Sequence, residues 1–335
     1  MPKREKKSLS IVDISKLAGV SVATVSRVIN KNGRFSAETQ KRVEEIISEN
    51  NYVPNLVAKG LKTKKTNFIG VIVPDITNEF FSMVAVEIQN SLRQHGYFAL
   101  ICNTREDISI EREYLDILNG IQMSGLIFIS GNTRIENESV RFLPTVYIDR
   151  APEYLGKSLV IESDNYSGGR MAANTLFEAG CRNIACLRYA KNISSHQRRH
   201  EGYRYELEAR GLSFNASLQF SVDEVSYNAA KTKMLEVMES GLAFDGIFCT
   251  TDWLALGTVA ALSERGKKVP GDVKVVGFDD ILSSRLSSSP LTTIRQQVDI
   301  MGRIAADEII KMINGENIDT SKIEIAVSLV KRQTT

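Results

Sequence analysis

From Asn67 onward, short β-rich runs alternate with amphipathic helical segments, and this alternation limits the possible folds more than any other feature of the chain. The β-rich runs are FIGVIVPD, FALICNT, GLIFIS, TVYIDR, NIACLRYA, GIFCTTD and VKVVGFDD. Helical segments such as FFSMVAVEIQNSLRQHG separate them. The pattern predicts an α/β fold with parallel sheets covered by helices on both faces. Since about 270 residues exceed the usual size of one domain, we expect two such lobes.

Composition excludes several classes of protein. Of the 335 residues 43% are hydrophobic, enough for a large core, yet no apolar run reaches the ~18–20 residues of a membrane helix. The basic start MPKREKKSLS has no apolar segment after it, so it does not resemble a secretory signal and we expect a cytoplasmic protein without membrane contact. The four cysteines form no CxxC pair. Reduced thiols are therefore expected, with no zinc site and no disulfide framework.

The net charge of +2 hides an uneven distribution of charge along the chain. Residues 1–66 contain 14 Lys or Arg against 6 Asp or Glu, a balance of +8, and the rest has 28 against 34, a balance of −6. A basic head on an acidic body indicates a polyanionic partner for the head alone. The alternative is a solvated basic tail, because KREKK supplies part of the excess.

The head has the signals of short helices joined by tight turns. Ser10 precedes IVDISKLA with Asp13 three residues on, which predicts a capping box. Gly19 ends this helix, and Ser21 begins the next, SVATVSRVIN. Such a pair is the helix-turn-helix pattern. Ser36 begins a third helix, AETQKRVEEIISEN. The apolar positions that pack the three helices together are expected to be Ile11, Ile14, Leu17, Ala18, Val43, Ile46 and Ile47.

The second predicted helix has two different sides. Val25, Val28 and Ile29 share one side at helical spacing and are expected in the core. Ala23 and Arg27 are neighbours on the other side. A small residue lets the helix approach a base edge, and an arginine can donate two parallel hydrogen bonds to guanine O6 and N7. An ordinary exposed arginine is the alternative. Hydroxyl groups that could donate to phosphate at the start of this helix belong to Ser21 and Thr24.

The stretch SIVDISKLAGVSVATVSRVIN, together with RFSAETQKRVEEIISENNYVPNLVAKGLKTKKTNFIGVIVPDITNEFF, closely resembles the lac repressor family of bacterial transcription regulators. The similarity continues to VSLVKR, so it covers nearly the whole chain. It implies that the second helix enters the major groove of DNA. The positions that match base-reading residues are Val22, Ala23 and Arg27. The positions that match contacts to the DNA backbone are Ile11, Ser21, Thr24, Ser26 and Asn30.

The same resemblance implies three parts: a helix-turn-helix head at 1–54, a hinge helix and linker at 55–66, and a two-lobed effector-binding and dimerisation domain at 67–335 that resembles periplasmic binding proteins. Leu61 matches the leucine that wedges into a base step in the minor groove; a linker leucine resting on the body is the alternative. Gly60 departs from the family, where a better helix former is usual. A glycine there costs about 1 kcal/mol of helix stability relative to alanine.

Polar and aromatic residues follow the predicted strands of the body, where open α/β sheets bind ligands. Carboxylates, guanidinium groups and amides suit the hydroxyl groups of a sugar, and aromatic faces suit its apolar surface. Taken singly, each charged residue could instead form a surface ion pair. By resemblance, Thr251 replaces an asparagine of the family. The positions that match effector contacts are Asp75, Asn78, Phe80, Phe81, Asp149, Arg150, Arg199, Phe220, Thr251, Asp279 and Gln296.

No feature of the body indicates an enzyme. The three histidines are not placed beside a nucleophile motif, and HExxH, Walker and GxGxxG motifs are absent. YSGGR is expected to open a helix instead of binding phosphate. We therefore expect no catalytic residue, no metal and no cofactor. A transport-type sugar-binding protein is the rival that the body alone permits.

The expected partners follow from the resemblance. Double-stranded operator DNA read by two heads favours a homodimer, and no leucine heptad follows VSLVKRQTT. SVATVSR, YIDR, RGKKVPGDVKVVGFDDI and PLTTIRQ resemble ribose-operon repressors, whereas INKNGRFS, SDNYSGG and AGCRNI resemble sucrose-operon repressors. We expect a small sugar effector, ribose first, with sucrose or fructose as alternatives. A phosphorylated protein co-regulator, and co-repression instead of induction, stay open.

Overall fold

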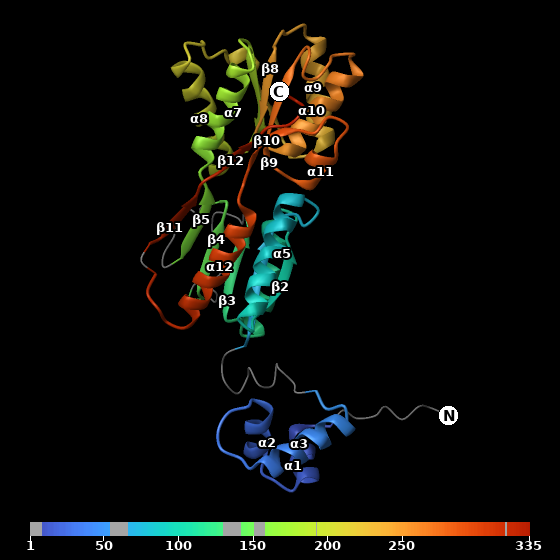
Figure 1. Cartoon of the computed structure of the whole chain (residues 1–335), viewed down its shortest axis with the longest axis vertical. Helices are drawn as coiled ribbons and strands as arrows, with labels where there is room; N and C mark the ends of the chain where they lie inside the picture. The colour runs from blue at the N-terminus through green and yellow to red at the C-terminus, as the bar shows by residue number, and fades with distance from the viewer. Residues whose placement is uncertain (1–8, 54–65, 130–141, 151–157, 192, 319) are drawn as a thin grey trace, which may run out of the picture. The chain divides into compact units, whose positions relative to one another are not determined.

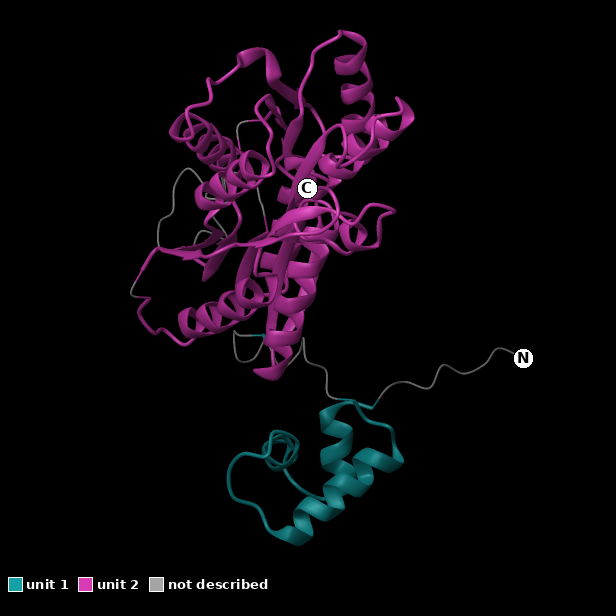
Figure 2. Cartoon of the chain, turned by 45° about the horizontal axis from the view of Figure 1, so that its top comes forward, with its two compact units in different colours: residues 1–66 teal, residues 67–335 magenta. Residues whose placement is uncertain are grey.

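The computed structural model describes residues 9–53, 66–129, 142–150, 158–191, 193–318 and 320–335. Its chain divides into two compact units, Met1–Thr66 and Asn67–Thr335 (Figure 2). Gly60 and Leu61, and nearly all of the expected hinge segment, lie outside the described residues.

The first unit contains three helices in its described part: α1 (Ile11–Ala18), α2 (Val22–Ile29) and α3 (Ala37–Glu49) (Figure 1). The predicted caps are present, because the Oγ atoms of Ser10, Ser21 and Ser36 each accept a hydrogen bond from the backbone N–H three residues on. Ser10 and Asp13 form the full capping box. Gly19, with a left-handed φ of 65°, ends α1 as expected.

The head core differs from the prediction at one position. Ile14, Ala18 and Val25 are buried as expected, but Leu17 is 56% exposed. The buried residues Ile14, Ser15 and Ala18 form a face of α1 centred near Ala18, and Leu17 lies about 100° round the helix from Ala18. Ser15 takes the place on the buried side that was assigned to Leu17.

The second unit consists of two lobes, each built on a six-stranded sheet (Figure 1). In the first lobe the strand order is β11-β5-β4-β3-β1-β2 and every pairing is parallel. Helices α5 (Glu79–Gln94) and α12 (Val298–Ile313) pack on one face, and α6 (Ile108–Gly120) packs on the other. The strands are β1 (Phe68–Val73), β2 (Phe98–Asn103), β3 (Gly125–Ile129), β4 (Thr145–Ile148), β5 (Leu159–Ser163) and β11 (Lys322–Ile325).

The second lobe has the order β12-β10-β9-β8-β6-β7, with only β12 antiparallel among its described pairings. Its strands are β6 (Ile184–Tyr189), β7 (Gln219–Val222), β8 (Gly246–Cys249), β9 (Lys274–Asp279), β10 (Thr292–Arg295) and β12 (Ser328–Val330). Its helices are α7 (Asn165–Glu178), α8 (Ser194–Ala209), the short 3-10 helix η1 (Ala216–Leu218), α9 (Tyr227–Glu239), α10 (Asp252–Glu264) and α11 (Leu282–Leu286). Separate apolar cores lie on its two faces. YSGGR falls in the first turns of α7, as predicted.

Within the described residues the chain passes between the lobes after β5, after β10 and between β11 and β12. Three segments of the chain therefore connect the two lobes, and the lobes can move as rigid bodies about these segments. None of the helices in the described part of the chain has the length and apolarity that a membrane crossing requires.

Helices α7 and α8 approach each other so closely that their contact needs glycine on both sides. A Cβ atom at Gly169 would lie 1.9 Å from the carbonyl oxygen of Arg199, and one at Gly202 would lie 2.0 Å from that of Tyr166. The backbones therefore touch directly at this crossing. Because Arg199 lies on α8 one turn before Gly202, the crossing also fixes the position of that side chain.

We expect Gly202→Ala to destabilise the second unit by about 1–3 kcal/mol, because the added methyl group must push two helix backbones apart. The midpoint of thermal unfolding measures the effect. Gly120→Ala is the matched control, since a Cβ atom at Gly120 has nothing within 4 Å. Equal unfolding midpoints for the two variants would contradict the prediction.

Candidate functional site

A cavity of about 560 Å³ lies between the carboxyl ends of the strands of the two lobes, and its size is that of a small-molecule site. Residues that follow β1, β2 and β4 line it from the first lobe, and residues that follow β6, β8 and β9 line it from the second. The structure brings nine of the sequence-predicted effector residues together here: Asp75, Asn78, Phe80, Phe81, Asp149, Arg150, Arg199, Thr251 and Asp279.

Arg199 is the central charge of the cavity. It is 2% exposed, and its guanidinium carbon lies 3.7 Å from the centre of the Phe278 ring. Its Nε donates to Asn165 Oδ1 at 2.8 Å, and its Nη1 donates to the carbonyl oxygen of Thr250 at 2.8 Å. Two fixed hydrogen bonds and a stacked ring leave the guanidinium group in one orientation.

Two carboxylates flank Arg199 at distances longer than hydrogen bonds. Arg199 Nη2 is 3.8 Å from Asp149 Oδ1, and Nη1 is 3.6 Å from Asp279 Oδ1. Burial raises the pKa of Asp279, although Arg199 and the hydrogen bond from Gln296 oppose this, and the negative charge of Asp149 raises it further. The two carboxyl groups share Arg199 between them, and hydroxyl donors from a ligand would favour the ionised form of Asp279.

Backbone strain accompanies both carboxylates. Asp149 has φ 70° and Asp279 has φ 122°, values that residues with a Cβ atom rarely adopt. Each such residue costs about 1–3 kcal/mol and is usually found where geometry matters for function. Asp149 directly follows β4 and Asp279 is the last residue of β9, so both conformations occur where a strand ends at the cavity.

Gln296 and Phe220 do not line the cavity. Gln296 is buried and supports Asp279 from behind, because its Nε2 donates to Asp279 Oδ1 at 2.7 Å while its Oε1 accepts from Ser163 at 2.7 Å. Phe220 is 8% exposed and belongs to the apolar core of the second lobe. The prediction that Phe220 forms an aromatic wall of the site is therefore wrong in this structure: its position on β7 places the ring in the core.

Two of the lining residues also begin helices. Asn78 caps α5 by accepting from the Phe80 N–H at 3.0 Å, which leaves its amide nitrogen available to donate. Thr251 caps α10 by accepting from the Leu254 N–H at 3.3 Å. Threonine at this position therefore keeps the capping function of an asparagine while offering a ligand one hydroxyl group.

Sequence reasoning missed a polar group in the cavity lining, formed by residues at or after the ends of β2, β4 and β6. Glu106 accepts hydrogen bonds from Arg150, Tyr189 and Lys191. The signal was present, since NTRE and YAKN end β-rich runs as the predicted site residues do. His196 also lines the cavity, and burial together with Arg199 keeps its pKa well below the ordinary value, so its ring is neutral.

On the head, α2 presents the side that was predicted to meet DNA. Ala23 and Arg27 are exposed, whereas Val25 and Val28 are buried. The stem of Arg27 lies beside Gly33, where a Cβ atom would be 3.1 Å from Arg27 Cδ. The remaining predicted positions are partly exposed or exposed: Ile11, Ser21, Val22, Thr24, Ser26 and Asn30.

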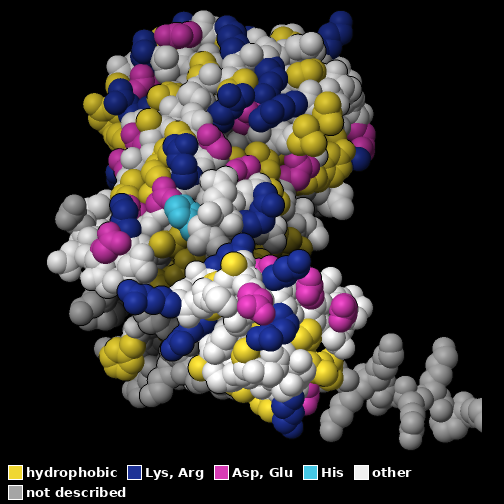
Figure 3. Space-filling model, turned by 60° about the horizontal axis from the view of Figure 1, so that its bottom comes forward, with side chains coloured by type: hydrophobic (Ala, Val, Ile, Leu, Met, Phe, Trp, Pro, Cys, Tyr) yellow, Lys and Arg dark blue, Asp and Glu magenta, His cyan; other side chains and the backbone are white. Residues whose placement is uncertain are grey.

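Polar side chains at the two ends of α2 form local hydrogen bonds. Ser21 Oγ lies 2.9 Å from Thr24 Oγ1, and Asn30 Nδ2 donates to the Ser26 carbonyl oxygen at 2.7 Å. The folded part of the head is nearly neutral, since residues 9–53 contain 6 Lys or Arg and 5 Asp or Glu. Basic and acidic side chains are interspersed on the surface in Figure 3. The excess positive charge therefore belongs to the segments that flank the three helices.

The structure offers no sign of metal or thiol chemistry in its described part. The residues described contain no group of three or more His, Cys, Asp or Glu that could hold a metal ion. All four cysteines are free and buried, and burial raises the pKa of the Cys102 thiol to about 11. A thiol in this state is inert at neutral pH.

Comparison with known proteins agrees with both units. Residues 10–55 match the model of bacterial regulatory proteins of the lacI family, and residues 173–335 match the periplasmic binding protein-like domain. The ribose operon repressor of Halalkalibacterium halodurans is 34% identical over 97% of each chain. The chain belongs to the lacI family. The predicted resemblance is thereby confirmed, and as a lacI-family member the chain is a DNA-binding transcription regulator.

Two further matches bear on the lacI-family fold and its diversity. The sucrose operon repressor of Pediococcus pentosaceus is 34% identical over 95% of this chain and 97% of its own. The crystal structure of the lac repressor dimer bound to operator and the anti-inducer ONPF is 25% identical, with a TM-score of 0.85 over 98% of this chain and 99% of that one. The predicted fold, a helical head followed by a two-lobed body, is confirmed.

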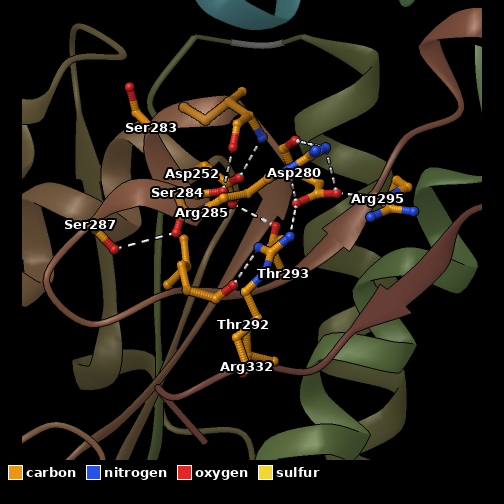
Figure 4. Close-up of polar contacts among 12 residues, drawn as sticks. Asp252, Asp280, Ser283, Ser284, Arg285, Ser287, Thr292, Thr293, Arg295 and Arg332 are labelled. Carbon is orange, nitrogen blue, oxygen red and sulfur yellow. Dashed lines mark hydrogen bonds and ion pairs between the residues drawn. The ribbon is translucent and has the colours of Figure 1, made fainter.

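A buried carboxylate holds the C-terminal segment of this lacI-family chain to the second lobe (Figure 4). Asp280 is 1% exposed and pairs with three arginines. Arg295 Nε donates to its Oδ2 at 2.6 Å, Arg285 Nη2 donates to Oδ2 at 3.0 Å, and Arg332 Nη2 bonds to Oδ1. Arg332 belongs to the VSLVKR motif, so the network explains that arginine as a structural residue.

Proposed function

We propose that the chain represses a carbohydrate-utilisation operon and releases its operator when a small sugar enters the cavity. Ribose is the first candidate, with sucrose or fructose next, in line with the relatives named above. The proposal assigns operator recognition to the head at 1–54, ordering on DNA to the hinge at 55–66, and effector binding and dimerisation to 67–335. The regulator would act as a cytoplasmic homodimer without a cofactor, and without enzymatic activity.

One observation carries the effector half of this proposal: Arg199 lies buried between Asp149 and Asp279 in the cavity. Carboxylates accept hydrogen bonds from hydroxyl pairs, and a guanidinium group donates to hydroxyl oxygens. The Arg150 Nε atom is buried without a hydrogen-bond acceptor in the described part of the chain, which leaves one more donor for a ligand. Phe80 and Phe81, with ring centres 5.6 Å apart, offer apolar faces to the carbons of a sugar ring.

The proposed mechanism uses the two lobes as a switch. Asp149 belongs to the first lobe and Arg199 to the second, so a sugar bonded to both favours one relative position of the lobes. A ligand can shift this equilibrium only by its difference in affinity between the two states. A changed lobe position in each subunit of a dimer would alter the spacing of the two heads and weaken operator binding.

A thermal-shift panel of sugars tests the effector assignment. D-ribose, sucrose and D-fructose are each titrated against the full chain, and a true effector raises the unfolding midpoint with concentration, because it binds only the folded state. A gel shift with operator DNA, selected from random fragments with the purified chain, then shows release or tightening. Tightening by the sugar would identify co-repression. Stabilisation by no sugar would favour a phosphorylated protein co-regulator or a non-sugar ligand, and failure to select any DNA would favour the transport-type alternative.

Arg27→Ala is expected to weaken operator binding by about 1–3 kcal/mol and to relax discrimination at one guanine in each half-site, if Arg27 reads that base. Binding to scrambled DNA should change little. Lys16→Ala, which removes another exposed cation of the head, is the control. Equal weakening on operator and scrambled DNA would make Arg27 a phosphate contact instead.

A further inference from the structure

Glu106 lines the cavity and joins the two lobes. It follows β2 in the first lobe, whereas Tyr189 and Lys191 lie at the end of β6 in the second. The Tyr189 hydroxyl donates to Glu106 Oε2 at 3.1 Å, and Lys191 Nζ donates to the same oxygen at 2.9 Å. From within the first lobe, Arg150 Nη2 donates to Glu106 Oε1 at 3.2 Å.

The surroundings of Glu106 hold its carboxylate in place and charged. Burial raises its pKa, but the hydrogen bonds and charges of Lys191 and Arg150 outweigh this and lower the pKa below the ordinary value. Arg105 and Glu106 have left-handed φ angles of 53° and 57°, a backbone conformation that non-glycine residues seldom adopt in succession. Glu106 therefore contacts the second lobe directly, side chain to side chain, through Tyr189 and Lys191.

Two other polar contacts across the lobes differ in kind. Ser283 on α11 donates to Glu79 on α5, so that contact joins one charged group to an uncharged one. Asp149 and Arg199 are 3.8 Å apart and are themselves candidates for ligand contact. The Glu106–Lys191 pair is both charged and within hydrogen-bond distance, and its positively charged partners come from both lobes.

We propose that Glu106 is a latch that holds the lobes together across the cavity before an effector arrives. The latch raises the fraction of chains in the close-lobed state, and the apparent dissociation constant of a ligand that binds this state equals its intrinsic constant divided by that fraction. Glu106 therefore sets the effector concentration at which the regulator responds. The effect of Glu106 on the effector concentration rests on the proposed function, whereas its effect on the lobes does not.

The latch can be measured without any ligand. Glu113→Cys on α6 and Thr232→Cys on α9 place one exposed thiol on each lobe for a donor and an acceptor dye. The four native cysteines are buried and should not be labelled. Labelled full-length chain is mixed with excess unlabelled chain, so that any dimer carries one dye pair. Single-molecule energy transfer then gives the ratio of close-lobed to open molecules.

Glu106→Gln keeps the size of the side chain and removes its charge. We expect the close-lobed to open ratio to fall about two- to fivefold, the effect of a partly exposed ion pair. Lys191→Met should lower the ratio similarly, and the double variant should add little to either change. Glu224→Gln is the matched control: it removes a carboxylate from the same cavity lining, and within the described residues its side chain has no hydrogen bond or ion pair. Its ratio should not change.

An unchanged or higher ratio in Glu106→Gln overturns the latch, and so does an equal fall in Glu224→Gln. A D-ribose titration on operator DNA then separates the two proposals. A half-release concentration that rises by the same factor by which the close-lobed fraction falls supports both. A lowered ratio with no ribose response, even in the parent chain, supports the latch and counts against ribose as the effector.

Discussion

Asp279→Ala is expected to abolish sugar-induced release of the operator while operator binding without sugar stays near that of the parent chain. Asp279 lies in the second unit, separate from the helices of the head. Its carboxylate accepts from Gln296 and lies 3.6 Å from Arg199. Loss of a charged hydrogen-bond acceptor costs a ligand about 1.5–3 kcal/mol, a tenfold to more than hundredfold loss of affinity. The response should therefore disappear at sugar concentrations that saturate the parent.

Gel shifts at increasing sugar concentration measure this response, and thermal unfolding shows whether the variant is folded. Asp279→Asn is the matched variant, because it keeps the size and one acceptor oxygen and tolerates the left-handed backbone better than alanine. It should retain more stability than Asp279→Ala and still lose most of the response. An intact response in both variants would show that this carboxylate does not contact the effector. Unfolding of both would make Asp279 a structural residue of the Arg199 cluster.

The sequence predicted the head and the order of the main strands well, because their signals are local. A serine directly before an amphipathic helical segment can cap that helix whatever the rest of the chain does. Ser10, Ser21 and Ser36 all cap helices. The seven β-rich runs became β1, β2, β3, β4, β6, β8 and β9. These strands are mostly buried on both faces, which explains their continuous apolar runs.

Five strands were not among the predicted runs: β5, β7, β10, β11 and β12. The last two, KIEI at β11 and SLV at β12, are short and partly polar, and each completes the edge of a sheet built from earlier residues. The periodicity of the sequence cannot show which of the two sheets such a segment joins. The step from β11 to β12 is also one of the three connections between the lobes, and the sequence pattern did not indicate it.

The residues that directly follow strands come together around the cavity as expected, whereas contacts between residues far apart in the chain were not foreseen. Phe220 was misplaced because alternation along β7 was not used to decide which face its ring occupies. Gln296 was expected at a ligand but supports Asp279, an arrangement that only side-chain geometry reveals. Glu106 was missed although NTRE follows a strand, because its partners Tyr189 and Lys191 are more than 80 residues away.

Asp280→Asn is expected to cause the largest loss of stability among single substitutions in the body considered above. Three arginines converge on the carboxylate, which is 1% exposed (Figure 4). Removing one partner of a fully buried ion pair costs about 3–5 kcal/mol; we expect about 2–4 kcal/mol, because the Arg285 and Arg295 side chains are 44% and 42% exposed. Asparagine keeps the shape of the side chain and tolerates φ 60°, so the loss of stability comes mainly from the removed charge.

The pH dependence of this loss identifies its cause. Burial raises the pKa of Asp280, but hydrogen bonds from Arg332 and Arg295 outweigh burial and hold the pKa below its ordinary value. A carboxyl group whose pKa is lower in the folded than in the unfolded chain stabilises the fold above the unfolded pKa of about 3.9, and this contribution is lost as pH falls through the folded pKa. In urea unfolding, the difference between parent and Asp280→Asn should stay constant from about pH 7 to 5 and shrink below about pH 4. Asp223→Asn, at an exposed position after β7, is the control and should match the parent throughout. A difference that persists undiminished at the lowest pH at which both chains still fold would mean that packing, and not the charge of Asp280, holds the C-terminal segment in place.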